Sequence, residues 1–295
     1  MINILVTGSN GQLGSELQAI HVSYLHYNFA FTDKESLDIT CKKNIALVCK
    51  EKNITHIINC AAYTAVDKAE TDQESANAIN NLAVRNLAEI AKDMDILLIH
   101  ISTDYVFDGK NFKPYLETDN TNPQSIYGKT KYDGEKAFLH VNPANGLIIR
   151  TSWVYSSFGN NFVKTMLRLG KERDALKVIF DQVGTPTYAR DLAKVVLDII
   201  GQKSRLPCFS RSDVAIYHYS NEGVLSWYDF AKEIMKMAKL PCKIDSIETS
   251  QYPTPAQRPY YSLLNKSKIK KEFNLSIPFW KDSLDECLQT MREGR

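Results

Sequence analysis

A short apolar segment runs directly into a glycine-rich turn at the start of this chain, and this junction constrains the fold more than any other feature. Residues 2–7 read Ile-Asn-Ile-Leu-Val-Thr, an apolar and β-branched run typical of a buried parallel strand. The turn carries Gly8, Gly11 and Gly14, and residues 15–20 have the character of a helix. A strand, a turn with this glycine spacing and a helix together predict a dinucleotide-binding unit, whereas an ordinary surface turn would lack these flanking elements.

Each glycine has a separate expected role. Gly8 permits the tight turn, Gly11 lets backbone N–H groups approach a pyrophosphate, and Gly14 lets the helix pack closely on the strand. The helix then directs the positive end of its dipole toward the phosphates. We therefore expect cofactor contacts along the whole turn, which adds the residues between the glycines: Asn10, Gln12 and Leu13.

A second strand, residues 28–32, ends at Asp33. A carboxylate about twenty residues past the last glycine can accept hydrogen bonds from both ribose hydroxyls of NAD and repels a 2′-phosphate. Two other interpretations stay open: Asp33 can simply begin a polar loop, and the neighbouring Lys34 can hold a phosphate. The sequence therefore favours NADH moderately over NADPH.

Composition limits the classes of partner. The 36 basic and 34 acidic residues nearly cancel, which gives no electrostatic case for nucleic acid or a membrane surface. The apolar runs are too short to cross a bilayer, and Met1 leads directly into the first strand, so we expect a cytoplasmic protein. The cysteines lack Cys-x-x-Cys pairing and are expected to be reduced, and the scattered histidines suggest no zinc site. The six cysteines are Cys41, Cys49, Cys60, Cys208, Cys242 and Cys287.

Strands and helices alternate over the first half of the chain, as they do in proteins with a parallel sheet. The pattern predicts helices at 42–52, 72–93 and 127–140, and strands at 56–59, 96–102 and 147–151. Beyond Thr151 the alternation loosens, with helices expected at 161–171, 190–200 and 227–239, an extended piece at 217–219 and a proline-containing connection at 241–259.

This order predicts an α/β fold, namely a Rossmann-like doubly wound parallel sheet with a smaller C-terminal substrate lobe. We expect residues 1–155 to form the nucleotide-binding domain, with 185–203 packing back on it. Residues 156–295 would mainly form the substrate lobe, because they contain no second phosphate-binding turn.

Tyr127 and Lys131 share a helix face, because they lie four residues apart. We expect the Lys131 ammonium to lower the pKa of the Tyr127 phenol, so that it can exchange a proton near neutral pH. Tyr-x-x-x-Lys is a weak signal by itself, but it gains weight behind a nucleotide-binding turn. At the end of the strand 96–102, a hydroxyl from Thr103 or Ser102 could meet the Tyr127 phenol across a substrate carbonyl. Thr103 could there hydrogen-bond a developing oxyanion, although a lone hydroxyl at a strand end usually caps a turn.

Seven segments carry a resemblance to a known family: TGSNGQLG (7–14), LDIT (37–40), NCAAYTAVDKAE (59–70), STDYVF (102–107), YGKTK (127–131), RTSWVY (150–155) and DQVGTPT (181–187). With these motifs the chain resembles the extended short-chain dehydrogenase/reductase family over essentially its whole length. The resemblance implies that Thr103, Tyr127 and Lys131 are the catalytic trio.

The same resemblance implies further site residues. Asp38 and Ile39 would lie beside the adenine, and Ala62, Tyr63 and Thr64 would pass under the cofactor. Thr103, Asp104 and Trp153 would bind the sugar, although Trp153 in an apolar strand would otherwise be read as part of the core. Cys60 stands where the family more often has alanine, a small change that should leave the site intact.

The implied reaction is reduction of dTDP-4-dehydro-β-L-rhamnose to dTDP-β-L-rhamnose, with hydride from NADH or NADPH and a proton from Tyr127. Two alternatives stay open: a nucleotide-sugar 4-epimerase that keeps NAD⁺ bound, and a non-catalytic subunit like the regulatory subunit of methionine adenosyltransferase. Members of the family sometimes dimerise and bind Mg²⁺ near the carboxyl terminus. Asp285, Glu286 and Glu293 have the spacing of a solvated helix face there, so no metal ligand is predicted.

Overall fold

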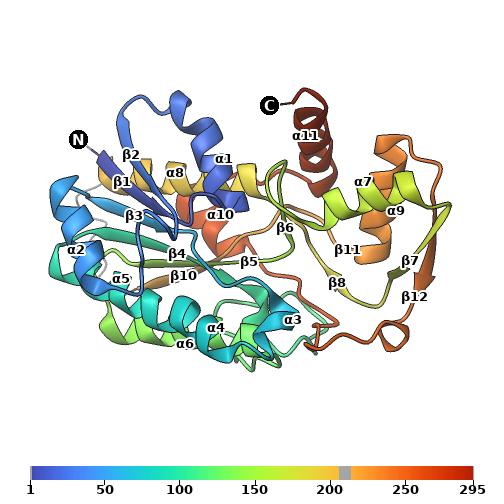
Figure 1. The fold of residues 1–295 in the computed structure, drawn as a ribbon, viewed down its shortest axis with the longest axis horizontal. Helices are drawn as coiled ribbons and strands as arrows, with labels where there is room; N and C mark the ends of the chain where they lie inside the picture. The colour runs from blue at the N-terminus through green and yellow to red at the C-terminus, as the bar shows by residue number, and fades with distance from the viewer. Residues whose placement is uncertain (1, 206–213, 295) are drawn as a thin grey trace.

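A six-stranded parallel sheet forms the centre of the computed structural model, which describes residues 2–205 and 214–294 (Figure 1). Cys208 lies outside the described residues. The strand order is β10-β5-β4-β3-β1-β2, and every neighbouring pair is parallel. The strands are β1 (Ile2–Thr7), β2 (Tyr27–Thr32), β3 (His56–Asn59), β4 (Leu97–Thr103), β5 (Leu147–Thr151) and β10 (Ala215–His218).

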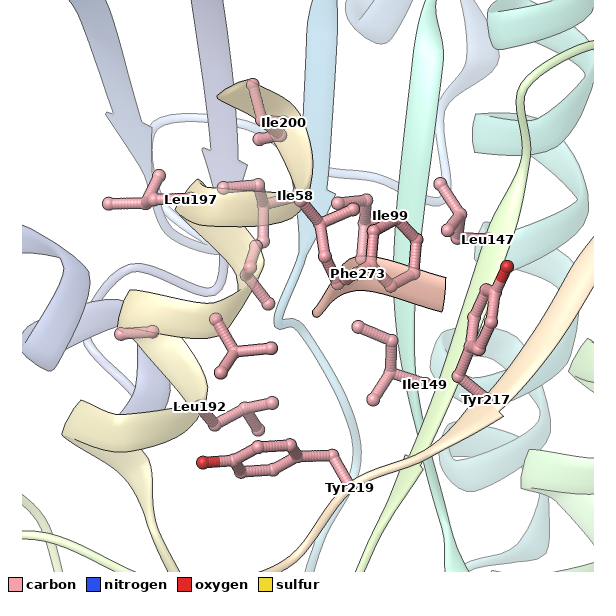
Figure 2. Close-up of a cluster of buried hydrophobic side chains, with 14 of the residues drawn as sticks. Ile58, Ile99, Leu147, Ile149, Leu192, Leu197, Ile200, Tyr217, Tyr219 and Phe273 are labelled. Atoms are coloured by element: carbon pink, nitrogen blue, oxygen red, sulfur yellow. The ribbon is translucent and has the colours of Figure 1, made fainter. Parts of the chain in front are cut away.

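Helices cover both faces of this sheet, because alternate strand residues point to opposite sides. Ile4 and Val6 of β1 join one apolar cluster and Leu5 joins the other. The first cluster includes side chains from α1 (Gln12–Ile20), α8 (Ala189–Arg205) and α10 (Ser267–Phe273), and part of it is drawn in Figure 2. The second includes side chains from α2 (Lys42–Glu51), α5 (Ala83–Asp93) and α6 (Ile126–Val141). The predicted α/β fold with a Rossmann-like doubly wound parallel sheet is confirmed.

A smaller region beyond the sheet, at the right in Figure 1, has a separate apolar cluster. Its helices are α7 (Phe162–Glu172), α9 (Trp227–Ala238) and α11 (Trp280–Arg292). Short strand pairs complete it: β6 (Val154–Tyr155) with β9 (Thr187–Tyr188), β8 (Val183–Gly184) with β11 (Leu225–Ser226), and β7 (Ala175–Ile179) with β12 (Lys243–Ile247).

The connection predicted at 241–259 contains the strand β12, which pairs with β7. The predicted helix at 72–93 is helical nearly throughout but is not one regular α-helix. It divides into α4 (Gln73–Asn77), a π-helical stretch (Ala78–Leu82) and α5. Asn80 in the π stretch is fully buried, and its side-chain amide bonds the backbone of Tyr63 and the hydroxyl of Thr130. The wider turn therefore places a polar side chain where α6 and the Tyr63 segment meet, a requirement that apolar periodicity does not reveal.

A short helix, α3 (Val66–Ala69), follows the segment after β3. None of the helices in the described part of the chain is long and apolar enough to span a membrane.

Candidate functional site

A cleft of about 760 Å³ opens at the carboxyl ends of the central strands. It lies where the strand order reverses, between β1 and β3. Parallel sheets bind ligands at such a switch point. All but one of the predicted cofactor residues line this cleft, the exception being Gly14. Those that line it are Gly8, Asn10, Gly11, Gln12, Leu13, Asp33, Asp38, Ile39, Ala62, Tyr63, Thr64, Tyr127 and Lys131.

The three glycines of the first turn differ in what surrounds them. Gly8 has a φ of +66°, and a Cβ there would lie 2.6 Å from the backbone N of Ala61. A Cβ on Gly14 would lie 2.5 Å from the carbonyl oxygen of Gly8, so Gly14 serves the packing of α1 on the turn. A Cβ on Gly11 would meet only the Gly8 oxygen, at 3.2 Å, and Gly11 faces the cleft.

Asp33 is held by hydrogen bonds at the edge of the cleft. Its Oδ2 accepts from Asn10 Nδ2 at 2.5 Å. Its Oδ1 accepts from the backbone N–H groups of Glu35 and Ser36 and from the Ser36 hydroxyl, at 2.8 to 3.1 Å. The hydrogen bonds from Ser36 are the main cause of the lowered pKa of Asp33. Asp33 therefore lies beside the predicted ribose position as a carboxylate, while it also begins a polar turn.

The predicted trio comes together where β4 meets α6. The N-terminus of α6 is fixed by Ser125, whose hydroxyl accepts from the backbone N–H of Gly128 at 3.1 Å. Tyr127, in the first turn of this helix, has its phenol beside the side chain of Thr103, close enough for Thr103 to affect the pKa of the phenol. One turn later, the Nζ of Lys131 donates to the carbonyl oxygen of Ile101 at 2.7 Å.

The prediction that Lys131 lowers the pKa of Tyr127 is wrong for this structure. Burial raises the pKa of Tyr127 to about 12, the neighbouring Thr103 side chain opposes this rise, and Asp104 adds to it. Burial also lowers the pKa of Lys131 to about 8. The ammonium of Lys131 points to a backbone carbonyl. With a pKa of about 12, the Tyr127 phenol is protonated at neutral pH and can act as a proton donor.

Two predicted sugar contacts, Asp104 and Trp153, do not line the cleft. Asp104 is buried and accepts a hydrogen bond from the Thr103 hydroxyl at 3.0 Å, and burial raises its pKa to about 7. Trp153 lies between β5 and β6 with a φ of +48°, and its ring stacks on Trp227 with centroids 3.6 Å apart. Trp153 is partly exposed and its backbone is in the left-handed conformation. It therefore does not fit the alternative interpretation, a core residue within a strand.

Sequence reasoning missed one wall of the cleft, the segment that follows β5. Val154, Gly159 and Asn160 line the cleft, although they lie far from the glycine turn in sequence. Gln12 explains the approach: its Nε2 donates to the carbonyl oxygen of Val154 at 3.3 Å, and its Oε1 accepts from Asn161 at 3.0 Å. The Gly-Asn-Asn sequence marks a turn, but it does not reveal which element the turn contacts.

Within residues 2–205 and 214–294, no cluster of three or more His, Cys, Asp or Glu side chains could hold a metal ion. Near the carboxyl terminus, Asp285 accepts from Gln289, and Glu286 accepts from Lys194. The five cysteines that the structure describes are free thiols.

A family model described as the RmlD substrate binding domain matches residues 2–293. The chain belongs to this family. Among curated members, it is 40% identical to the dTDP-4-dehydrorhamnose reductase of Aggregatibacter actinomycetemcomitans over 290 residues, covering 96% of this chain and 97% of the relative. It is 41% identical to the reductase of that name from Escherichia coli strain K12 over 300 residues, covering 98% of each.

Solved structures of the RmlD family have the same fold. A dTDP-4-dehydrorhamnose reductase from Clostridium acetobutylicum superposes with a TM-score of 0.91 at 42% identity, covering 99% of this chain and all (100%) of that one. A dTDP-4-dehydrorhamnose reductase from Bacillus anthracis, solved in complex with NADP, gives a TM-score of 0.90 at 38% identity, with 98% and 99% coverage.

Proposed function

We propose that this protein is an NAD(P)H-dependent dTDP-4-dehydrorhamnose reductase, which reduces dTDP-4-dehydro-β-L-rhamnose to dTDP-β-L-rhamnose. One observation carries the proposal: Thr103, Tyr127 and Lys131 meet beside a cleft lined by a glycine-rich turn, as a carbonyl reductase requires. Relatives of that name, about 40% identical over nearly the whole chain, support the assignment of the substrate.

The cleft fits a nicotinamide dinucleotide. The space beside Gly11 is free of other side chains, and α1 begins at the next residue, so its N-terminus faces a bound pyrophosphate. Cys60, Ala61 and Ala62 leave room beside Lys131 at the other end of the cleft. When bound there, the nicotinamide supplies the hydride for C4 of the sugar.

The protein residues divide the remaining work. Tyr127 gives its phenolic proton to the sugar oxygen, and its high pKa means that the proton is present at neutral pH. The Thr103 hydroxyl, which lies beside the Tyr127 phenol, stabilises the same oxygen as charge develops on it. Lys131 would hold the nicotinamide ribose through its ammonium group.

The sugar nucleotide is proposed to bind on the C-terminal side of this trio. Trp153 presents an aromatic platform whose orientation is set by stacking on Trp227. Asp104 lies next to Thr103 and would bind a sugar hydroxyl. We assign the substrate lobe mainly to residues 156–295 and the cofactor domain to 1–155 with 185–203, to which β10 adds an edge strand. A homodimer and a cytoplasmic location stay predictions from the sequence, and Mg²⁺ binding is implied by the family resemblance alone.

A coupled assay tests the proposal. Purified protein receives dTDP-4-dehydro-6-deoxyglucose, a 3,5-epimerase and NADPH or NADH, and both the reduced cofactor and the dTDP-sugar product are quantified. We expect one cofactor oxidised for each dTDP-rhamnose formed. A 4-epimerase would convert sugar without net cofactor consumption, and a regulatory subunit would show no turnover but would co-purify with methionine adenosyltransferase.

A further inference from the structure

Three consecutive residues at the end of β4 each contact one residue of α6, and the three α6 residues are spaced four apart. Ile101 accepts a hydrogen bond from Lys131, and the Ser102 hydroxyl donates to Glu135 at 2.5 Å. The Thr103 side chain lies beside the Tyr127 phenol and affects its pKa. Residues four apart lie above one another on a helix, so one face of α6 is joined to one strand end over two turns.

Glu135, the last member of this face, belongs to a buried ion pair. Its side chain is fully buried, and Arg150 on β5 is only 2% exposed. The guanidinium Nε lies 3.0 Å from Oε1 and Nη2 lies 2.7 Å from Oε2, which is a bidentate arrangement. Arg150 pairs in register with Ser102 across the sheet, and its guanidinium lies 5.1 Å from the centroid of the Phe107 ring. Glu135 therefore connects α6, β4 and β5 behind the reacting groups.

Stability alone does not account for a charged pair at this position. Taking two charges out of water costs several kcal/mol per ion, and well-packed apolar residues of similar volume often stabilise a fold as well or better. A bidentate pair instead fixes direction and distance, which apolar packing does less strictly. Its position one turn beyond Lys131 also places a carboxylate near the buried ammonium.

We propose that Glu135, clamped by Arg150, is a positioning residue that holds Tyr127 and Lys131 in register with Thr103 and keeps the Lys131 ammonium charged. The groups facing that ammonium support this role. Cys60, after β3, is a thiol whose pKa is raised to about 12 by burial. His100, on β4, is neutral because burial holds its pKa well below the usual value. Tyr127 is protonated, so none of these three groups carries a negative charge at neutral pH. Glu135 is the carboxylate that offsets the cost of burying the Lys131 ammonium.

This inference rests on the proposed function, in which Lys131 holds the nicotinamide ribose, and its test includes a measurement that needs no turnover. NADPH affinity is measured by fluorescence titration as a function of pH for the wild type, Glu135→Gln and Glu135→Asp. Affinity should weaken as Lys131 loses its proton, near pH 8 in the wild type. Glu135→Gln should move that break to lower pH by about one unit or more, because a carboxylate one helical turn away no longer favours the ammonium.

Glu135→Asp separates geometry from charge. It keeps the carboxylate but shortens the side chain, so the break in NADPH affinity should stay near its wild-type pH. Turnover should fall by about tenfold or more, since a displacement of about 1 Å at a distant support is enough to misplace reacting groups.

Asp191→Asn is the matched control for removing a buried carboxylate. Asp191 is 4% exposed and is hydrogen-bonded to Asn221 and Ser283, outside the cleft. This variant should lower the unfolding temperature while leaving the pH break and the turnover as in the wild type.

The inference is overturned if Glu135→Gln binds NADPH with the wild-type pH break, or if Glu135→Asp turns over like the wild type. Should Glu135→Gln not fold, the turnover of Glu135→Asp still decides the positioning role. Failure of the proposed function looks different, because the wild type itself would then not reduce the dTDP-sugar, while the binding titrations would still test Glu135.

Discussion

Asn10 in the glycine turn donates a hydrogen bond to Oδ2 of Asp33 at the end of β2. This contact joins the phosphate end of the cleft to the predicted ribose position. It also fixes the direction of the Asp33 carboxylate, which Ser36 and Glu35 hold from the other side. The charge that we expect to discriminate between the two cofactors therefore has a defined place.

Replacing Asp33 with alanine should change the choice of cofactor. Asp33→Ala should improve kcat/KM for NADPH relative to NADH by about tenfold, because a charge that repels the 2′-phosphate is removed. Lys34→Ala is the matched control and should change the ratio in the opposite direction. Steady-state kinetics with both cofactors measure the effect. An unchanged ratio in Asp33→Ala would mean that Asp33 only begins the polar turn.

Side chains at two glycines of the first turn should have different consequences. Gly11→Val should fold and lose NADPH binding, because the added methyl groups occupy space in the cleft, while its Cβ needs the Gly8 carbonyl oxygen, 3.2 Å away, to shift only by a few tenths of an ångström. Gly14→Ala should instead destabilise the protein by about 1–3 kcal/mol, because its Cβ would collide with backbone atoms of the turn. Thermal unfolding and fluorescence titration of NADPH separate the two effects. Normal NADPH affinity in Gly11→Val would contradict the assignment of the pyrophosphate position.

The sequence predicted those parts of the fold that depend on local pattern. β3 and β5 begin and end where expected, because each is a short apolar run between polar residues. The Tyr127 helix also lies close to its predicted range, since Ser125 begins it with a hydroxyl cap. The glycine turn was recognisable because its backbone conformation requires glycine at a fixed spacing.

What the sequence could not predict depends on contacts between distant segments. Residues 217–219 were expected to be extended, but nothing in their pattern places β10 beside β5 as the edge of the sheet. The cleft wall at Gly159 and Asn160 follows from contacts of Gln12, more than 140 residues away. The pKa of Tyr127 depends on burial and on the direction of the Lys131 side chain, neither of which is encoded in the four-residue spacing.

Asp104 should make the protein less stable as pH rises. Burial raises its pKa from 3.8 to about 7 in the folded protein, so the folded state keeps a proton that the unfolded state loses between these values. Folding is then coupled to proton uptake, and stability falls with pH through this range. Asp104→Asn removes the effect.

Denaturant unfolding of the wild type and Asp104→Asn near pH 5 and pH 8 measures this difference. The wild type should lose about 2 kcal/mol more than the variant over that range, as a pKa shift of this size implies. Equal pH dependence in the two proteins would show that Asp104 is ionised in the folded state throughout.

The role of Tyr127 as proton donor is the central claim, and turnover by Tyr127→Phe tests it most directly. Removing the phenolic oxygen should lower kcat by about 10²-fold or more while NADPH binding stays largely unchanged, the effect expected for a positioned acid. Tyr132→Phe on the same helix is the matched control, since Tyr132 packs on the cluster of Val106, Phe107, Tyr115 and Leu264 and should keep its turnover. A Tyr127→Phe variant that reduces the dTDP-sugar at a rate near that of the wild type would contradict the account.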